Sequence, residues 1–222
     1  MRSSLTLFIV VALMSTGFAK SDKKKTDTAA GDNVVHFSES TPNCKVAVQN
    51  GDRVDVVNNG QYEIAVTEKL DTFAERYQNI WVRVKNLDDK ALEVTPEAVK
   101  LQLLKPKAKT LKAEDPEKLS KDIERAAYKR KADLVTPNCP VQQVTQCLPS
   151  ASAASEAENV VHEADGQKIW ISEHALTAKT LQKNEKSEGS VFFPREKKMQ
   201  DYAVLVSVGD TTYEFPGSTS TK

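Results

Sequence analysis

The sequence predicts a mainly β fold, an antiparallel β-sandwich with one inserted α-helix. Short runs of alternating apolar and polar residues recur along the chain, with turn-forming residues between them, and this pattern is typical of a sandwich. The regular alternation of helix and strand that would predict a parallel sheet is missing. We therefore expect a single domain over residues 34–216.

Period-two patterning predicts the individual strands. The run 80–85 is the clearest, with one apolar face and Trp81 on the opposite face. Asn59-Gly60 separates two further apolar runs and predicts a hairpin, because both residues tolerate positive φ. Other strands are expected over 45–48, 53–57, 62–67, 91–94, 99–103, 189–194, 202–208 and 211–215.

One segment has helical spacing and predicts a helix over 115–132. Asp115 is a good N-cap, Pro116 suits the first helical position, and basic residues gather in the last turns, where the helix dipole favours cations. Residues 134–159 contain prolines and a run of small residues, so we expect a long loop there. The run 168–171 is expected to be either a short strand or an apolar staple.

The beginning of the chain predicts export. Residues 1–19 combine Arg2, an apolar run over 5–14 and the small-x-small site Gly17-Phe18-Ala19, which is the layout of a signal peptide. The apolar run is shorter than the roughly 20 residues that a membrane-spanning helix needs. We expect a protein of the periplasm or the cell exterior, with no transmembrane segment after signal cleavage.

Polar tails are expected at both ends of the predicted domain. Residues 20–33 and 217–222 are rich in charged or hydroxyl side chains and poor in apolar ones, so both should be disordered. The 31 basic and 31 acidic residues balance, so no overall electrostatic field points to nucleic acid as a partner.

The three cysteines, Cys44, Cys139 and Cys147, allow one disulfide and leave one thiol over. Any of the three pairings is compatible with the sequence. We favour the local pair Cys139–Cys147, which would close a short loop.

Residues 81–86 followed by 92–96, then 99–101, and finally 189–194, together resemble a known group of domains. They are similar to the immunoglobulin-like β-sandwich domains of exported bacterial proteins of unknown function, the DUF4352-like modules. The resemblance extends over 62–215 and implies an antiparallel immunoglobulin-like β-sandwich. It implies a role in binding or in envelope structure, and it brings no catalytic residues and no cofactor.

A search for reaction chemistry gives one weak candidate. The chain has no glycine-rich phosphate loop, no His-Glu-x-x-His and no Gly-x-Ser-x-Gly motif. His162 and His174, together with neighbouring carboxylates, would have to come together to bind a metal ion. A metal-dependent hydrolase is the third hypothesis for this chain, and solvated surface histidines are the simpler interpretation.

The first hypothesis is an exported, non-enzymatic immunoglobulin-like module that binds a protein or a cell-envelope component. Its binding surface is expected on the inserted helix and the cysteine-containing loop, since insertions on a rigid sandwich commonly carry specificity. The second hypothesis is a secreted protease inhibitor or chaperone-like factor that uses the loop 136–149. The candidate surface residues are Arg125, Lys129, Arg130 and Trp170.

Overall fold

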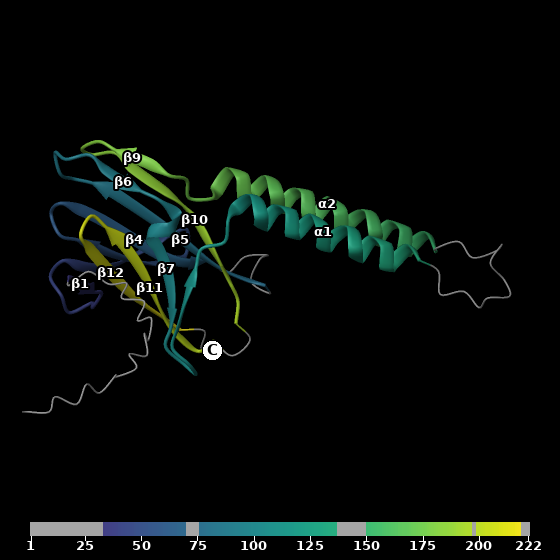
Figure 1. The fold of residues 1–222 in the computed structure, drawn as a ribbon, viewed down its shortest axis with the longest axis horizontal. Helices are drawn as coiled ribbons and strands as arrows, with labels where there is room; N and C mark the ends of the chain where they lie inside the picture. Colours follow the sequence, from purple (N-terminus) through teal and green to yellow (C-terminus); the bar gives the residue numbers. More distant parts are fainter. Residues whose placement is uncertain (1–32, 70–75, 137–149, 197–198, 219–222) are drawn as a thin grey trace, which may run out of the picture.

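A computed structural model describes residues 33–69, 76–136, 150–196 and 199–218. In this part of the chain, two five-stranded sheets lie face to face, a two-stranded sheet lies beside them, and two long helices extend away from the strands (Figure 1). The fold is therefore mainly β, as the sequence predicts, but it contains two long helices instead of the expected one.

The first sheet has the strand order β1-β12-β11-β7-β8. Its pairs are antiparallel except for β1 and β12, which are parallel. The strands are β1 (Val34–His36), β12 (Thr211–Ser218), β11 (Asp201–Val208), β7 (Val99–Leu103) and β8 (Lys109–Lys112). Because β12 pairs along its whole length with β11, Gly217 and Ser218 belong to a strand and not to the expected tail.

The second sheet has the strand order β10-β5-β4-β3-β2, and every pair in it is antiparallel. Its strands are β10 (Lys186–Pro194), β5 (Tyr77–Asn86), β4 (Tyr62–Lys69), β3 (Asp52–Asn58) and β2 (Cys44–Gln49). The two-stranded sheet pairs β6 (Leu92–Val94) with β9 (Lys179–Leu181), and the short 3-10 helix η1 (Pro96–Ala98) precedes β7.

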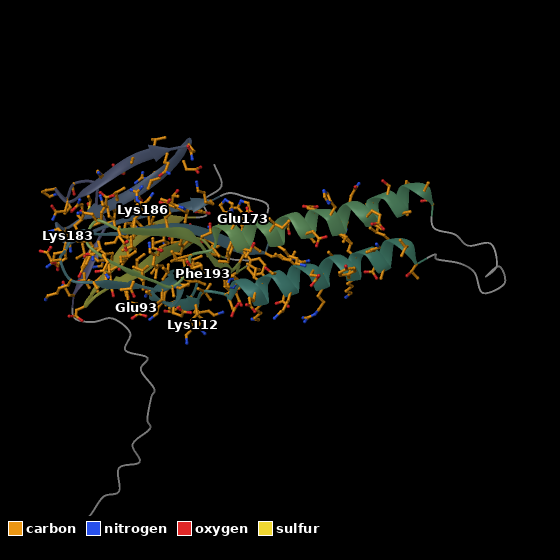
Figure 2. The ribbon with its side chains drawn as sticks, turned by 90° about the horizontal axis from the view of Figure 1, so that it is seen from above. Glu93, Lys112, Glu173, Lys183, Lys186 and Phe193 are labelled. Atoms are coloured by element: carbon orange, nitrogen blue, oxygen red, sulfur yellow. The ribbon has the colours of Figure 1, made fainter. Side chains whose placement is uncertain are left out.

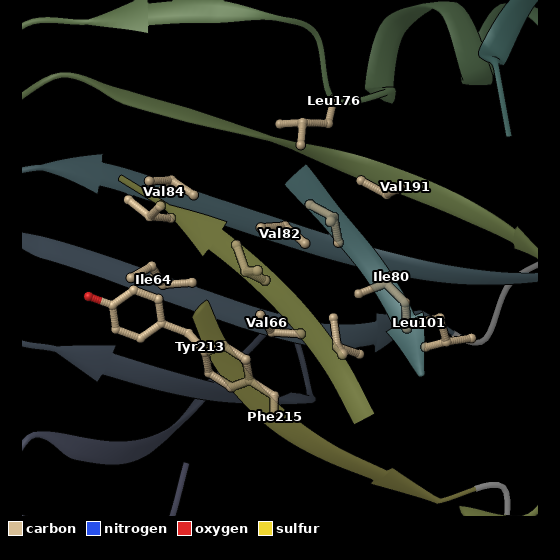
Figure 3. Packing of buried hydrophobic residues seen from close by; sticks show 14 of the residues in the cluster. Ile64, Val66, Ile80, Val82, Val84, Leu101, Leu176, Val191, Tyr213 and Phe215 are labelled. Carbon is tan, nitrogen blue, oxygen red and sulfur yellow. The ribbon is translucent and has the colours of Figure 1, made fainter. Parts of the chain in front are cut away.

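The main core lies between the inner faces of the two large sheets (Figure 3). The predicted apolar face of β5 is buried there, which confirms the period-two prediction. The predicted hairpin is also confirmed: Gly60 has φ of 87°, and Asn59 Oδ1 accepts hydrogen bonds from the backbone N–H groups of Gln61 and Tyr62. The core residues labelled in Figure 3 are Ile64, Val66, Ile80, Val82, Val84, Leu101, Leu176, Val191, Tyr213 and Phe215.

The two helices form an antiparallel hairpin between β8 and β9 (Figure 1). The first, α1 (Pro116–Val135), confirms the predicted helix, and Asp115 is its N-cap, accepting hydrogen bonds from Glu117 and Lys118. The second, α2 (Ala151–His174), corrects two predictions, because the expected loop 134–159 is helical from Ala151 and the run 168–171 is helical and forms no strand. The apolar packing that was the alternative for 168–171 is present, since Ile171 and Trp170 pack against Phe192. All the prolines of that loop precede Ser150, which caps α2, and the small residues after it include alanines with high helix propensity.

Cys44 is buried at the edge of the main core, and it has no disulfide partner among the described residues. Cys139 and Cys147 lie in 137–149, outside the described residues, so the predicted disulfide stays a prediction. The proposed signal peptide and nearly all of both predicted tails also lie outside the described residues.

Candidate functional site

The hairpin is attached to the sandwich through β10. At its base, Leu119 of α1 and Ile171 of α2 are buried against Phe192 of β10. Backbone hydrogen bonds fix the chain on both sides of the hairpin: Glu114 N–H donates to the carbonyl of Phe192 (2.8 Å), and Leu176 N–H donates to that of Ser190 (2.9 Å). The base therefore has a defined position on the sheet.

Beyond the base, where Leu119 and Ile171 lie, the buried residues of the two helices are alanines. Ala157, Ala164 and Ile171 are the buried residues of α2 and recur every seven positions, while Ala127 is buried on α1. Alanines let helices approach closely, but each buries little apolar area. Three ion pairs also join the helices across the hairpin: Arg130–Glu156 at 3.2 Å, Lys131–Glu158 at 2.7 Å and Lys168–Glu124 at 2.9 Å.

The structure separates the predicted surface residues into two groups. Arg125 and Lys129 are exposed one turn apart on α1, and Arg125 pairs with Asp122 at 3.1 Å. Arg130 is also exposed and reaches α2 through its ion pair with Glu156. Trp170 lies at the base of the hairpin, so it does not share a surface with these three residues.

Trp170 is half-buried and has two aromatic neighbours. Its ring stacks on His174, with ring centroids 4.6 Å apart, and meets Phe192 edge to face at 6.1 Å. A nitrogen of the imidazole, Nδ1, also lies 2.9 Å from the backbone carbonyl of Trp170. Trp170, predicted as a surface residue, therefore packs at the base of the hairpin, and it also lines the groove described below.

The predicted pair of metal-binding histidines is not brought together. His162 and His174 lie twelve positions apart on α2, which corresponds to about 18 Å along the helix axis. One chain cannot place both on the same ion at ordinary coordination distances of about 2 Å. No group of three or more His, Cys, Asp or Glu residues in the described part of the chain is arranged to hold a metal ion.

A groove of about 600 Å³ lies between the outer face of the second sheet and the base of α2. Trp81, Thr67 and Val54 contribute to it from the sheet. We name it the Trp81–Trp170 groove, because these are the only two tryptophans of the chain and both line it. The remaining lining residues are Gln49, Asn50, Asp52, Lys69, Glu173, His174, Glu188, Gly189 and Ser190.

The sequence analysis did not predict this groove. The alternation along β5 placed Trp81 opposite the core face, and an outward tryptophan was the one available signal. Its neighbours across the sheet, Thr67 and Ser190, follow only from the strand register. The contribution of Glu173 and His174 follows from the helical conformation of α2, which the sequence analysis did not predict.

A polar cluster lies between the two large sheets of the sandwich. The hydroxyl of Tyr202 donates to a carboxylate oxygen of Glu68, and the amide nitrogen of Gln78 donates to the other oxygen. Burial raises the pKa of the Tyr202 phenol above its ordinary value, and the hydrogen bond to Glu68 adds to that shift. The phenol is protonated at neutral pH, as in an ordinary tyrosine, and donates a hydrogen bond in the core, and the raised pKa keeps it protonated to a more alkaline pH.

No family model, curated protein or solved structure matches this chain. Neither helix in the described ranges combines the length and apolarity that crossing a membrane requires. Function has to be inferred from the fold and from the two surfaces described above, the helical hairpin and the Trp81–Trp170 groove.

Proposed function

We propose that this protein is an exported, non-enzymatic module with an immunoglobulin-like sandwich, which binds a protein partner of the cell envelope through its helical hairpin. The observation that carries the proposal is the position of the hairpin, which extends well beyond the sheets (Figure 1). None of the described residues of α1 and α2 belongs to the main core. A long element that the core does not use is available to contact another molecule.

The strand order supports an immunoglobulin-like topology. Such sandwiches place strands C, F and G in one sheet and strands A, B and E in the other. The order β7-β11-β12 matches C-F-G, and the order β4-β5-β10 matches A-B-E with the same succession along the chain. The hairpin then occupies the connection between C and E, where a sandwich of this class has strand D.

The exposed side chains of the hairpin suit a protein partner. Tyr128 is 55% exposed and lies one turn from Arg125 on α1, and Ile169 is 58% exposed on α2. Tyrosine and arginine are enriched at protein interfaces, and large apolar side chains supply contact area there. Since Arg125 and Lys129 are both basic, the partner surface should carry acidic groups.

The proposal is tested with a shortened hairpin. Deleting 125–167 and joining the ends by a short turn keeps the Glu124–Lys168 pair, which marks facing positions on the two helices, and keeps the buried base. The tagged full-length and shortened proteins are cross-linked in envelope extracts, and captured proteins are identified by mass spectrometry. We expect the specific partner to be lost with the shortened hairpin, and an unchanged set of partners would contradict the proposal.

A charge-reversal pair separates surface recognition from a general effect of charge. Arg125→Glu with Lys129→Glu should weaken capture of the same partner. Lys90→Glu with Lys112→Glu makes the same change in net charge at exposed positions of the sandwich and should leave capture unchanged. Equal losses in both double variants would mean that the hairpin is not the recognised surface.

A further inference from the structure

We propose that the Trp81–Trp170 groove is a binding site for an organic cation, that is, for an ammonium or guanidinium group. The volume of about 600 Å³ falls within the range of about 300–1,000 Å³ that is usual for small-molecule sites. The groove lies at the base of the hairpin. The proposal therefore does not depend on the proposed role of the part of the hairpin beyond its base, which we call the exposed arm.

Aromatic rings supply the first part of the argument. Trp81 comes from β5 and Trp170 from α2, so residues far apart in sequence bring both indoles to one groove. Tryptophan is the side chain that attracts cations most strongly through its ring face. The guanidinium of Arg83 already lies 5.8 Å from the ring centroid of Trp81, although Arg83 does not line the groove.

The charges of the groove supply the second part. Of its three carboxylates, Asp52 is paired with Lys69, and Glu188 is paired with Lys186 at 3.1 Å. The third, Glu173, has no ion-pair partner within the described ranges, and it lies at the end of α2 that meets the sandwich (Figure 2). The negative end of the α2 dipole lies at this same end of the helix, because α2 ends at His174.

The ligand class follows from the two parts together. An anion would be repelled by the Glu173 carboxylate, which has no ion-pair partner among the described residues, and by the negative end of the helix dipole. A neutral molecule could contact the indoles but would leave that charge without a partner. An ammonium or guanidinium group would be attracted by both the rings and the carboxylate, so we choose an organic cation as the occupant.

Intrinsic fluorescence gives a direct test, since both tryptophans of the chain line the groove. Choline is titrated into the full protein in parallel with its uncharged isostere 3,3-dimethyl-1-butanol. We expect saturable quenching or a spectral shift with choline, with a dissociation constant in the millimolar range that is ordinary for so small a ligand. No saturable change with choline, or an equal change with the isostere, would overturn the proposal.

A matched pair of variants locates the binding. Glu173 is exposed, so Glu173→Gln should fold normally and weaken choline binding by up to about fivefold, the range for one exposed charge contact. Glu93→Gln removes another exposed carboxylate, from β6 and outside the groove, and should leave the dissociation constant unchanged. Equal behaviour of the two variants would place the cation elsewhere.

Two further experiments identify the source of the cation and distinguish this proposal from the proposed protein-binding function. A short lysine peptide that binds more tightly than choline would point to a basic segment of a protein, and the reverse order would point to a free small molecule. The protein with 125–167 deleted retains Trp170, Glu173 and the base of the hairpin. It should therefore bind choline like the full chain, whether or not it has lost the partner of the arm.

Discussion

At the scale of single residues, Gly189 determines how the hairpin rejoins the sandwich. A Cβ at this position would lie 2.5 Å from the backbone nitrogen of Leu176 and 2.6 Å from its Cα. The neighbouring Leu176 N–H donates to the carbonyl of Ser190, so the two segments cannot separate without losing that bond. Only glycine allows so close an approach of backbones.

Substituting this glycine should therefore affect stability strongly. We expect Gly189→Ala to lower the free energy of unfolding by about 1–3 kcal/mol, the usual cost of overpacking. Gly166 lies in α2 with nothing within 4 Å of its Cβ position, so Gly166→Ala should raise stability by about 0.5–1 kcal/mol through helix propensity. Urea unfolding of both variants checks the prediction, and a shift of the same sign in both would contradict it.

The buried phenol of Tyr202 predicts a loss of stability at alkaline pH. Its pKa is raised in the folded protein by burial and by the hydrogen bond to Glu68. The unfolded chain loses this proton near pH 10, while the folded chain keeps it, so the stabilisation is complete below pH 10 and declines as the pH rises further.

The matching experiment compares the wild type with Tyr202→Phe. At pH 7 the variant should be about 1–3 kcal/mol less stable, because Glu68 loses a buried donor. Between pH 9 and pH 11 the wild type should lose about 1.4 kcal/mol more than the variant, since only the wild type carries this titrating group. Denaturant unfolding at the three pH values measures both differences, and parallel losses between pH 9 and pH 11 would contradict the linkage.

At the scale of elements, the alanines between α1 and α2 limit the distance between the helices. Ala164 is buried in this interface, whereas Ala154 is exposed on the same helix. We expect Ala164→Leu to destabilise the protein by about 1–3 kcal/mol, because the larger side chain does not fit. Ala154→Leu should change stability by less than about 0.5 kcal/mol. Unfolding followed by circular dichroism at 222 nm reports the helices, and equal effects would show that the interface tolerates larger residues.

The elements also differ in how well the sequence predicts them. Strands with one buried face, such as β5, follow from alternation, and α1 follows from Asp115, Pro116 and an apolar stripe. The second helix was missed because its buried positions are mostly alanine, so its stripe has little apolar contrast. A seven-residue recurrence of Ala157, Ala164 and Ile171 after the N-cap Ser150 was the signal that could have found it.

The candidate sites also differ in how far they could be predicted from the sequence. The positions of Arg125, Lys129 and Arg130 on an exposed helix could be predicted from the sequence, because the helical spacing of α1 is clear there. The Trp81–Trp170 groove required the pairing of β4, β5 and β10 and the docking of α2, all of which are contacts between distant parts of the chain. Such contacts are set by tertiary packing, which periodicity along one segment does not specify.

At the scale of the whole molecule, stability should be distributed unevenly between the sandwich and the arm. The main core joins both large sheets and excludes the helices, while the far part of the hairpin is held by Ala157, Ala164 and exposed ion pairs. Exposed ion pairs contribute roughly 0–1 kcal/mol each. The base differs, because Leu119 and Ile171 are buried there against Phe192.

Hydrogen exchange followed by mass spectrometry should therefore show a gradient along the hairpin. Amides at 151–160 should exchange first, those near Ile171 later, and those of β5 last, because local opening costs less where little apolar surface is buried. Deleting 125–167 should leave the protection of β5 unchanged, since the sandwich has its own core. Uniform protection along α2, or a loss of protection in β5 after the deletion, would contradict this prediction. Either result would mean that the arm and the sandwich fold as one cooperative unit, so that the core depends on the arm.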